Sequence, residues 1–349
     1  MSVLWKGAGA AENLSGAAGG AKRNSPALGV AVLVVALGLV PLLSLSEYTI
    51  GVLTLIFIYA SVNLSWNYVL GHAGILSFAS LAFFAIGGYT AGILNTEAGI
   101  SPWLAFLAGG AAGGLAGLAV GIPSLRLYGP YMVLFTLCFH MMIQVVISTD
   151  TSGFTGGALG LTGIESLGLP GVGDKVDAGY YLGLLLVAAT YLAIRKVLNG
   201  PIGLALRSLR DDEAAAVARG VSRTAHRQIV FVSSSVLLGL AGAFYACYYG
   251  YISPVVLSLA LVMNLFAMVV VGGLGSRLGP VLGTALLVLV NEQLQSAELW
   301  RPFIWGAIVV VTLLLVPRGI APAAGEAWRR LRRMFDEWME EEVEVSSDT

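Results

Sequence analysis

Charged side chains are scarce in this 349-residue sequence, in which Asp, Glu, Lys and Arg together make up only 11% of the residues. Soluble domains contain about 25% charged residues, and the 57% of hydrophobic residues here is also high for a soluble domain. The composition therefore predicts a polytopic membrane protein. Because backbone polar groups in lipid must be paired inside the protein, we expect an all-α bundle of transmembrane helices.

The sequence also has few side chains that form disulfides or bind metals. Cys138 and Cys247 lie in apolar runs without CxxC spacing, and His72, His140 and His226 are widely separated. Neither a disulfide framework nor a metal site is supported. The chain has no GxxxxGK(S/T) loop for ATP and no GxSxG or HExxH motif, so we expect a non-enzyme that binds no cofactor itself.

Long apolar runs follow one another along the chain, separated by charged breaks or breaks rich in Gly and Pro. A helix needs about 20 apolar residues to cross a bilayer. Ten runs meet or approach this length: 27–45, 48–70, 75–94, 103–122, 131–148, 180–197, 229–251, 257–271, 280–297 and 302–317. We therefore expect about ten spans within residues 27–318, flanked by tails at residues 1–26 and 319–349.

Basic residues are unevenly distributed between the two ends of these spans. If the N-terminus is cytoplasmic, only Lys175 and Arg301 of the nineteen Lys and Arg fall outside. Cytoplasmic loops carry an excess of Lys and Arg, so both termini are predicted to be cytoplasmic. The C-terminal tail has a basic cluster at 329–333 followed by acidic residues at 336–344. We expect a solvated helix there, with contact to anionic lipid or a partner as the alternative.

Ionisable residues are nearly absent from the interior of the runs, where Glu292 is the only carboxylate. Carriers coupled to protons or sodium place such groups near the midplane, so the driving force is expected to come from elsewhere. Neutral polar residues in the runs suit a pathway for a small, partly apolar solute, with an interhelical hydrogen bond as the alternative role for each. The predicted pathway residues are Ser77, Tyr89, Thr90, Thr136, His140 and Gln144. His140 has no carboxylate partner at helical spacing, which favours packing over proton relay.

Glycines recur every four residues in the run 103–122, at Gly109, Gly113, Gly117 and Gly121. At helical pitch this row forms a groove without side chains, which lets another helix approach closely. We therefore expect these glycines to serve helix packing.

A basic stretch at residues 195–227 interrupts the apolar sequence and holds seven of the nineteen Lys and Arg. Pro201 suits a first helical turn and Gly220 a helix end, so one or two short helices are predicted. If the helix is continuous, one face carries both apolar residues and a carboxylate, which indicates insertion into a groove of a partner protein. That face comprises Ile202, Leu206, Leu209, Glu213, Ala216 and Val217.

Part of this stretch, Glu213-Ala-Ala-Ala-Val-Ala-Arg-Gly220, resembles the EAA loop of ABC importer permeases, which docks onto a separate ATPase subunit. In the strictest spacing Ala214 takes the place of the glutamate, and Glu213 lies one residue early. The resemblance implies a coupling loop at residues 198–227. The coupling residues would be Leu206, Leu209, Arg210, Asp212, Glu213, Ala215, Ala216 and Gly220.

Four further segments resemble the permeases of branched-chain amino acid ABC transporters, of the LivM type. They are Gly71 to Thr90, Pro123 to Tyr131, Thr155 to Leu161, and Val269 to Ser276 with Gly279-Pro280. The resemblance covers nearly the whole transmembrane part. It implies half of a translocation pathway for branched-chain amino acids in a bacterial-type plasma membrane, within a heterodimer with a second permease subunit. ATP and Mg would be bound by ATPase subunits, and no nucleic acid is expected as a partner.

The resemblance further implies delivery of solute by an extracytoplasmic binding protein, with Thr155, Gly156 and Gly157 in the expected contact loop. One departure concerns the substrate: this chain has Ala79-Ser80 where the family commonly has Gly-His. Urea, short amides or other small organic solutes are therefore alternatives. A stand-alone carrier or facilitator that needs no ATPase is the alternative from a different class, and a membrane scaffold is disfavoured by the polar residues in the runs.

Overall fold

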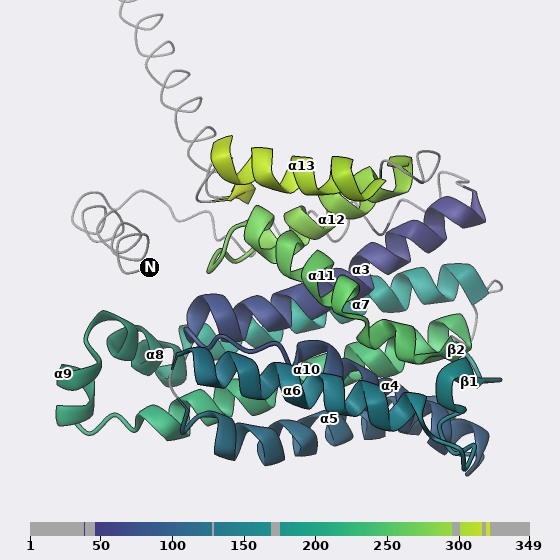
Figure 1. The fold of residues 1–349 in the computed structure, drawn as a ribbon, viewed down its shortest axis with the longest axis horizontal. Coiled ribbons are helices and arrows are strands. Elements are labelled where there is room, and N and C mark those ends of the chain that lie inside the picture. Colours follow the sequence, from purple (N-terminus) through teal and green to yellow (C-terminus); the bar gives the residue numbers. More distant parts are fainter. Residues whose placement is uncertain are drawn as a thin grey trace, which may run out of the picture.

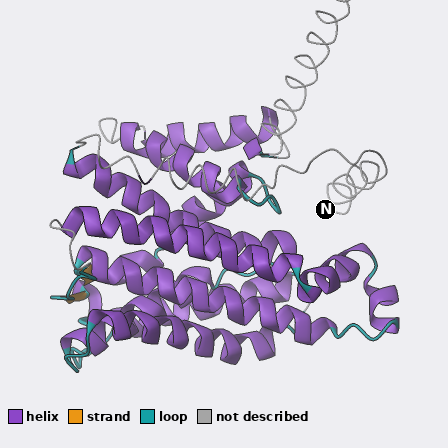
Figure 2. Ribbon diagram, turned by 180° about the vertical axis from the view of Figure 1, so that it is seen from behind, coloured by secondary structure: helices purple, strands orange, loops and turns teal. Residues whose placement is uncertain are grey.

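The computed structural model describes residues 38, 46–127, 129–168, 175–294, 301–315 and 319–321. Helices make up most of this part of the chain (Figures 1 and 2). The long helices are α3 (Glu47–Asn67), α4 (Ser80–Thr96), α5 (Pro102–Ser124), α6 (Pro130–Ser148), α7 (Lys175–Asn199), α10 (Arg223–Tyr249), α11 (Leu259–Gly272), α12 (Gly279–Gln293) and α13 (Arg301–Leu315). Shorter elements are α8 (Pro201–Asp211), α9 (Glu213–Ala218), η2 (Tyr68–His72), η3 (Gly157–Leu159), η4 (Pro254–Leu257), β1 (Leu161–Thr162) and β2 (Tyr251–Ile252).

The all-α bundle expected from the composition is confirmed, and each predicted run from 48–70 onward coincides with one of the long helices. Among the residues that the structure describes, five helical segments are long and apolar enough to cross a membrane: Glu47–His72, Pro102–Ser124, Pro130–Ser148, Val176–Asn199 and Arg223–Tyr249. The predicted run 27–45 lies outside the described residues except for position 38, as do the tail 1–26 and nearly all of 319–349. The chain is therefore a helical protein with several membrane-span candidates.

Three of the predicted boundaries were wrong by more than four residues. The run at 180–197 is helical already from Lys175. The run at 75–94 becomes helical only at Ser80, because residues 74–79 form an irregular segment in which Gly74 has φ +65°. The run at 229–251 becomes helical already at Arg223, since the Ser222 hydroxyl accepts a hydrogen bond from the Ala225 amide and caps the helix. Polar caps thus extend helices beyond their apolar part.

The centre of the bundle is a three-helix group of α4, α5 and α10, which lie side by side in both views (Figures 1 and 2). Glycines lie at their contacts. A Cβ added to Gly239 of α10 would be 2.6 Å from the carbonyl oxygen of Gly109 in α5, and one added to Gly109 would be 2.5 Å from that of Gly87 in α4. The three backbones therefore touch, as small residues permit in membrane helices.

Most of the remaining helices lie on one side of this group, away from α5 (Figure 1). α3 packs against α7 and also contacts α10, α11 and α12, while α13 lies outermost against α11 (Figure 1). The core is formed mostly by apolar side chains, and the largest fully buried ones are Trp66, Tyr68, Tyr180, Phe83, Phe84 and Phe231. α3 thus connects the three-helix group to α11 and α12.

The two ends of the bundle carry different structures. α8 and α9 project from one end, and β1 and β2 lie at the other (Figure 1). There Leu161 pairs with Ile252 and Thr162 with Tyr251 in an antiparallel two-stranded sheet. The end with α8 and α9 is the one that sequence analysis predicts to be cytoplasmic.

Candidate functional site

The segment from α8 to α10 contains the predicted coupling residues. α8 starts with Pro201 in its first turn, directly after the end of α7. Gly203 is buried against the carbonyl group of Leu198, where any Cβ would collide with backbone. This close approach lets α8 fold back against the end of α7.

The segment forms two short helices, one of the two arrangements predicted, so the condition for one shared face, a continuous helix, is not met. Asp212 adopts an extended conformation, with φ −152° and ψ 100°, which ends α8. Its carboxylate accepts a hydrogen bond of 3.0 Å from the Ala215 amide and so caps α9. α9 ends at Ala218, and Gly220 two residues later has φ +88°, a conformation that favours glycine. Arg210 is exposed at the end of α8, and Ala215 is half-buried.

The break redistributes the apolar face expected from the sequence. Leu206, Leu209 and Ala216 are buried within this chain, so they do not form a free stripe for insertion into a partner. Leu204 and Val217 are instead the exposed large apolar residues of the two helices, at 69% and 50% exposure. The surface left for a partner thus combines these two side chains with basic residues such as Arg207 and Arg219.

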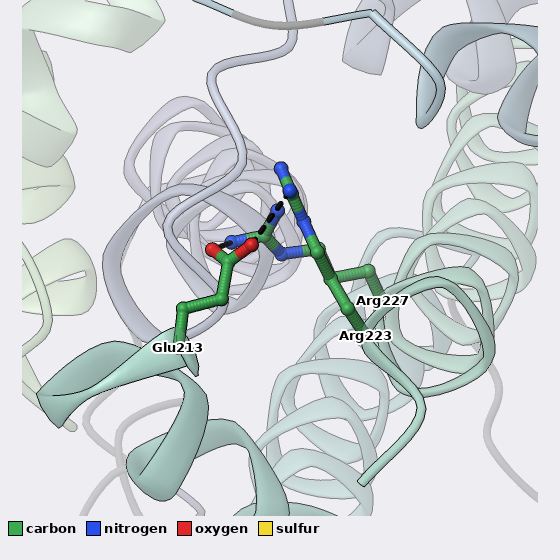
Figure 3. A network of polar contacts seen from close by, with 3 residues as sticks. All are labelled: Glu213, Arg223 and Arg227. Atoms are coloured by element: carbon green, nitrogen blue, oxygen red, sulfur yellow. Dashed lines mark hydrogen bonds and ion pairs between the residues drawn. The ribbon is translucent and has the colours of Figure 1, made fainter. Parts of the chain in front are cut away.

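Glu213 bridges α9 to the start of α10 through two arginines that sequence analysis missed (Figure 3). Its Oε1 is 2.6 Å from a guanidinium nitrogen of Arg223, and its Oε2 is 3.5 Å from one of Arg227. The arginines are four residues apart, so they lie on one face of α10. All three side chains are partly exposed, and such pairs individually contribute about 0–1 kcal/mol. The bridge therefore serves to orient α9 relative to α10 more than to stabilise the fold.

Three of the predicted pathway residues are brought together around residues 74–79, the irregular segment before α4. The fully buried Thr136 of α6 accepts a hydrogen bond of 3.1 Å from the Phe78 amide. The hydroxyl of Ser77 accepts one of 3.3 Å from the Ala79 amide, and the Ser77 carbonyl accepts one of 2.8 Å from the Trp66 indole. His140 lies one helical turn beyond Thr136 on α6.

His140 is fully buried and links α6 to η4. Its Nε2 lies 2.8 Å from the carbonyl oxygen of Leu257, and because that oxygen can only accept, Nε2 carries the proton. Nδ1 is buried without a hydrogen-bond partner among the described residues. Nε2 thus forms the interhelical hydrogen bond of a packing residue, and Nδ1 can accept a hydrogen bond from another donor.

The other predicted pathway residues are not linked to this group by hydrogen bonds among the described residues. Tyr89 is buried in the middle of α4, within electrostatic reach of Tyr251, and its hydroxyl has no hydrogen-bond partner in the described part of the chain. Thr90 and Gln144 are half-buried. Sequence analysis therefore selected polar residues from two separate regions.

The predicted packing glycines lie along the contact between α5 and α10. Gly109 faces Gly87 and Ala243, Gly113 faces Ser235 and Gly239, and Gly117 faces Ser235. Gly121 lies against the side chain of Gln228. The spacing of four residues therefore forms a groove in α5 that α10 fills.

The loop after α6 is organised by a carboxylate. Asp150 accepts hydrogen bonds from the backbone amides and hydroxyls of Ser152 and Thr155. Hydrogen bonds from Ser152 and then from Thr155 hold the pKa of Asp150 well below its usual value of 3.8. Gly156 and Gly157 have φ of +72° and +55°, so the turn needs glycine there. Intramolecular geometry thus accounts for the predicted contact residues Thr155, Gly156 and Gly157.

Hydrogen bonds between buried polar groups link distant helices, and several of the described helices are long and apolar enough to cross a membrane. These features define a multi-pass helical membrane protein. A family profile for the permease component of branched-chain amino acid transport systems matches residues 48–316. The chain belongs to this family of membrane permeases. No solved structure matches the chain.

Individual relatives agree with the family. The chain is 30% identical over 301 residues to the high-affinity branched-chain amino acid transport system permease protein LivM of Escherichia coli, across 79% of this chain and 71% of that protein. It is 29% identical to LivM of Salmonella typhimurium over the same length and shares. Over 122 residues it is 30% identical to the permease protein LivH of Escherichia coli, across 34% of this chain and 39% of LivH.

Proposed function

We propose that this chain forms half of the translocation pathway of an ABC importer for branched-chain amino acids in a bacterial-type inner membrane, driven by ATPase subunits that dock on α8 and α9. The substrate follows from the family profile and from the transport named for LivM in two organisms. ATP and Mg would be bound by the partner ATPase. The partial similarity to LivH supports a second, related permease subunit as the other half.

The observation that carries the coupling role is the bridge from Glu213 to Arg223 and Arg227. α9 has only six residues and projects from the bundle, whereas α10 runs through its centre. A push on α9 would reach α10 through this bridge and through the loop at 219–222. Alternating access could then follow from rigid-body movement of helices as the ATPases open and close.

The loop after α6 and the interior of the bundle provide the proposed binding-protein contact and the proposed solute pathway. The turn fixed by Asp150 presents an ordered surface for an extracytoplasmic binding protein, with Phe154 and Leu159 exposed at 59% and 85%.

Inside, Ser77, Thr136 and His140 provide polar groups next to aromatic rings, which suits a zwitterionic, apolar amino acid. The unpaired Nδ1 of His140 can accept a hydrogen bond from an ammonium group.

The test is reconstitution of the full chain with a candidate LivH-type subunit, ATPase subunits and binding protein in liposomes. We expect uptake of labelled leucine that requires ATP and is blocked by vanadate, and no uptake of urea or short amides. Uptake by this chain alone, or uptake driven by a proton or sodium gradient without ATP, would identify a stand-alone carrier instead. Failure of every ATPase to co-purify would also contradict the proposal.

A further inference from the structure

A cleft with basic walls opens at the α8 end of the bundle, where the ends of α3 and α7 meet the loop between α11 and α12. It contains about 340 Å³ of space between atoms, part of which is open to solvent. Its polar lining includes Asn67 and His72 at the end of α3, Arg195 and Asn199 on α7, and Arg277 in the loop.

The charge of the cleft is of one sign. Arg195 and Arg277 line it, and none of its lining residues is acidic. Arg207 and Arg210 of α8 lie within electrostatic reach of the His72 ring. In the described part of the chain, neither Arg195 nor Arg277 forms an ion pair with a carboxylate. Such a concentration of positive charge favours an anion.

The position of Arg277 is fixed by an unusual clamp. The Asn67 side chain, only 2% exposed, accepts a hydrogen bond of 2.8 Å from the Gly275 amide and donates one of 2.9 Å to the Ser276 carbonyl. Gly71 lies so close to Gly275 that any Cβ would collide with its backbone. A buried side chain thus holds the loop that carries Arg277, so the arginine is pre-positioned at the cleft.

The end of α3 is also irregular at this point. Residues Tyr68–His72 form a π-helical turn, closed by a hydrogen bond of 3.3 Å from the Ala73 amide to the Tyr68 carbonyl. π-turns within helices are frequent at functional sites. The π-helical turn directly follows the regular helix α3, and its last residue, His72, lines the cleft.

The rest of the cleft is apolar. Leu64, Ile194 and Leu198 line it together with the ring of Tyr191. These side chains are at most 8% exposed and belong to the core, so the cleft has arginines beside an apolar floor, a lining that suits an amphiphile with a charged headgroup. Arginine also pairs with phosphate through two parallel hydrogen bonds.

We propose that this cleft binds the phosphate group of an anionic phospholipid, held by Arg195 and Arg277, with the glycerol and upper acyl chain against Leu64, Ile194 and Leu198. The lipid would connect the end of α7, just before α8, to the loop between α11 and α12. Basic pockets at the cytoplasmic side of membrane helices suit such headgroups, and the cleft lies at the end predicted to be cytoplasmic. The site requires no transport activity, so its test is separate from that of the proposed function.

The test uses the purified full-length chain, stripped of lipid in detergent, with lipid binding measured by native mass spectrometry. We expect phosphatidylglycerol to bind in preference to phosphatidylcholine, and inorganic phosphate not to compete at millimolar concentration. The double variant Arg195→Gln, Arg277→Gln should bind phosphatidylglycerol at least about tenfold more weakly, since two charge-assisted contacts are lost. The matched control Arg126→Gln, Lys196→Gln removes two exposed charges outside the cleft lining and should bind like the unaltered chain.

Three results would overturn the proposal: equal binding by the cleft variant and the unaltered chain, an equal loss in the control variant, or displacement of the lipid by inorganic phosphate. If the double glutamine variant does not fold, Arg277→Lys replaces it. That variant keeps the charge but loses the paired hydrogen bonds, so we expect weakened phosphatidylglycerol binding of several-fold. Unchanged binding in Arg277→Lys together with Arg195→Lys would equally exclude the site.

Discussion

The Nδ2 of Asn63 in α3 donates a hydrogen bond of 2.7 Å to the Oγ1 of Thr284 in α12, across 221 positions of sequence. Both side chains are fully buried, and Thr284 in turn donates to the Pro280 carbonyl of its own helix. The Oδ1 of Asn63 has no hydrogen-bond partner among the described residues. This bond is the direct polar connection between α3 and α12.

The two partners of this bond should not be equivalent in stability measurements. Thr284→Val removes the oxygen acceptor and leaves the buried Nδ2 of Asn63 only its weak hydrogen bond of 3.7 Å to the Sδ of Met268, so we expect a loss of about 1–3 kcal/mol. Asn63→Leu removes the unpaired oxygen as well as the bond, so its cost should be nearer the ~0.6 kcal/mol of an average interhelical bond. Reversible unfolding in mixed micelles measures both. Thr54→Val is the control, because its hydroxyl bonds only to Ile50 in its own helix. An equal cost for Thr284→Val and Thr54→Val would contradict this role.

The bridge from Glu213 should matter for transport more than for folding. We expect Glu213→Arg to reduce ATP-driven uptake at least about tenfold, because it repels both Arg223 and Arg227, while the expression level and melting temperature change little. Adding Arg223→Glu should restore part of the uptake by reversing the pair. Asp211→Asn, which removes an exposed carboxylate two residues earlier, serves as the control. No rescue in the double variant would show that Glu213 acts through other contacts.

The contact of α5 with α10 should tolerate no added side chain. Gly113→Val would place atoms against the Ser235 carbonyl oxygen, only 2.6 Å from the Cβ position, and against Gly239. We expect a loss of at least about 1–3 kcal/mol, typical of overpacking, measured by thermal unfolding in detergent. Gly306→Ala in α13, with nothing within 4 Å of the added atom, should be neutral or slightly stabilising. A similar loss at both positions would mean that space is not the cause.

The loop after α6 should respond to acid. The folded pKa of Asp150 is lowered by hydrogen bonds from Ser152 and Thr155, so its stabilising effect is present above the usual value of 3.8 and disappears as the pH falls below it. Hydrogen exchange of residues 150–160 should therefore be slow at pH 7 and, after correction for the intrinsic rate, faster at acidic pH. Asp150→Asn should show fast exchange at both pH values. Glu97→Gln, an exposed residue at the same end, should leave this loop unchanged; a pH response that survives in Asp150→Asn would assign it to another group.

The helices of this protein were predictable because lipid requires long apolar runs. The row of packing glycines from Gly109 to Gly121 was predictable because its members recur every four residues. The faces of α8 and α9 were not. Asp212 could be seen as polar, but its extended conformation depends on the cap that it forms with Ala215. Leu206 and Leu209 become buried because Gly203 lets α8 fold onto the end of α7, a contact that the helical pattern does not encode.

The candidate site was predictable only in its local part. Glu213 was selected from a short motif. Arg223 and Arg227 belong to the next helix, and they lie close to Glu213 only because the chain turns at Gly220. The clamp of Asn67 on Gly275 joins residues 208 positions apart, and that contact depends on how α3 lies against α11 and α12. A useful signal was present in the sequence, since Asn63 and Asn67 lie four residues apart on one face of α3.

The glycine contacts among α4, α5 and α10 determine what can move. Side chains can change rotamers and slide past one another, but backbones in direct contact at Gly87, Gly109 and Gly239 have no such slack. A rotation imposed on α10 therefore has to carry α4 and α5 with it. The mobile part of this permease is then a block three helices thick, and its sliding surfaces are the side-chain contacts that α10 and α4 make with α3 and α6.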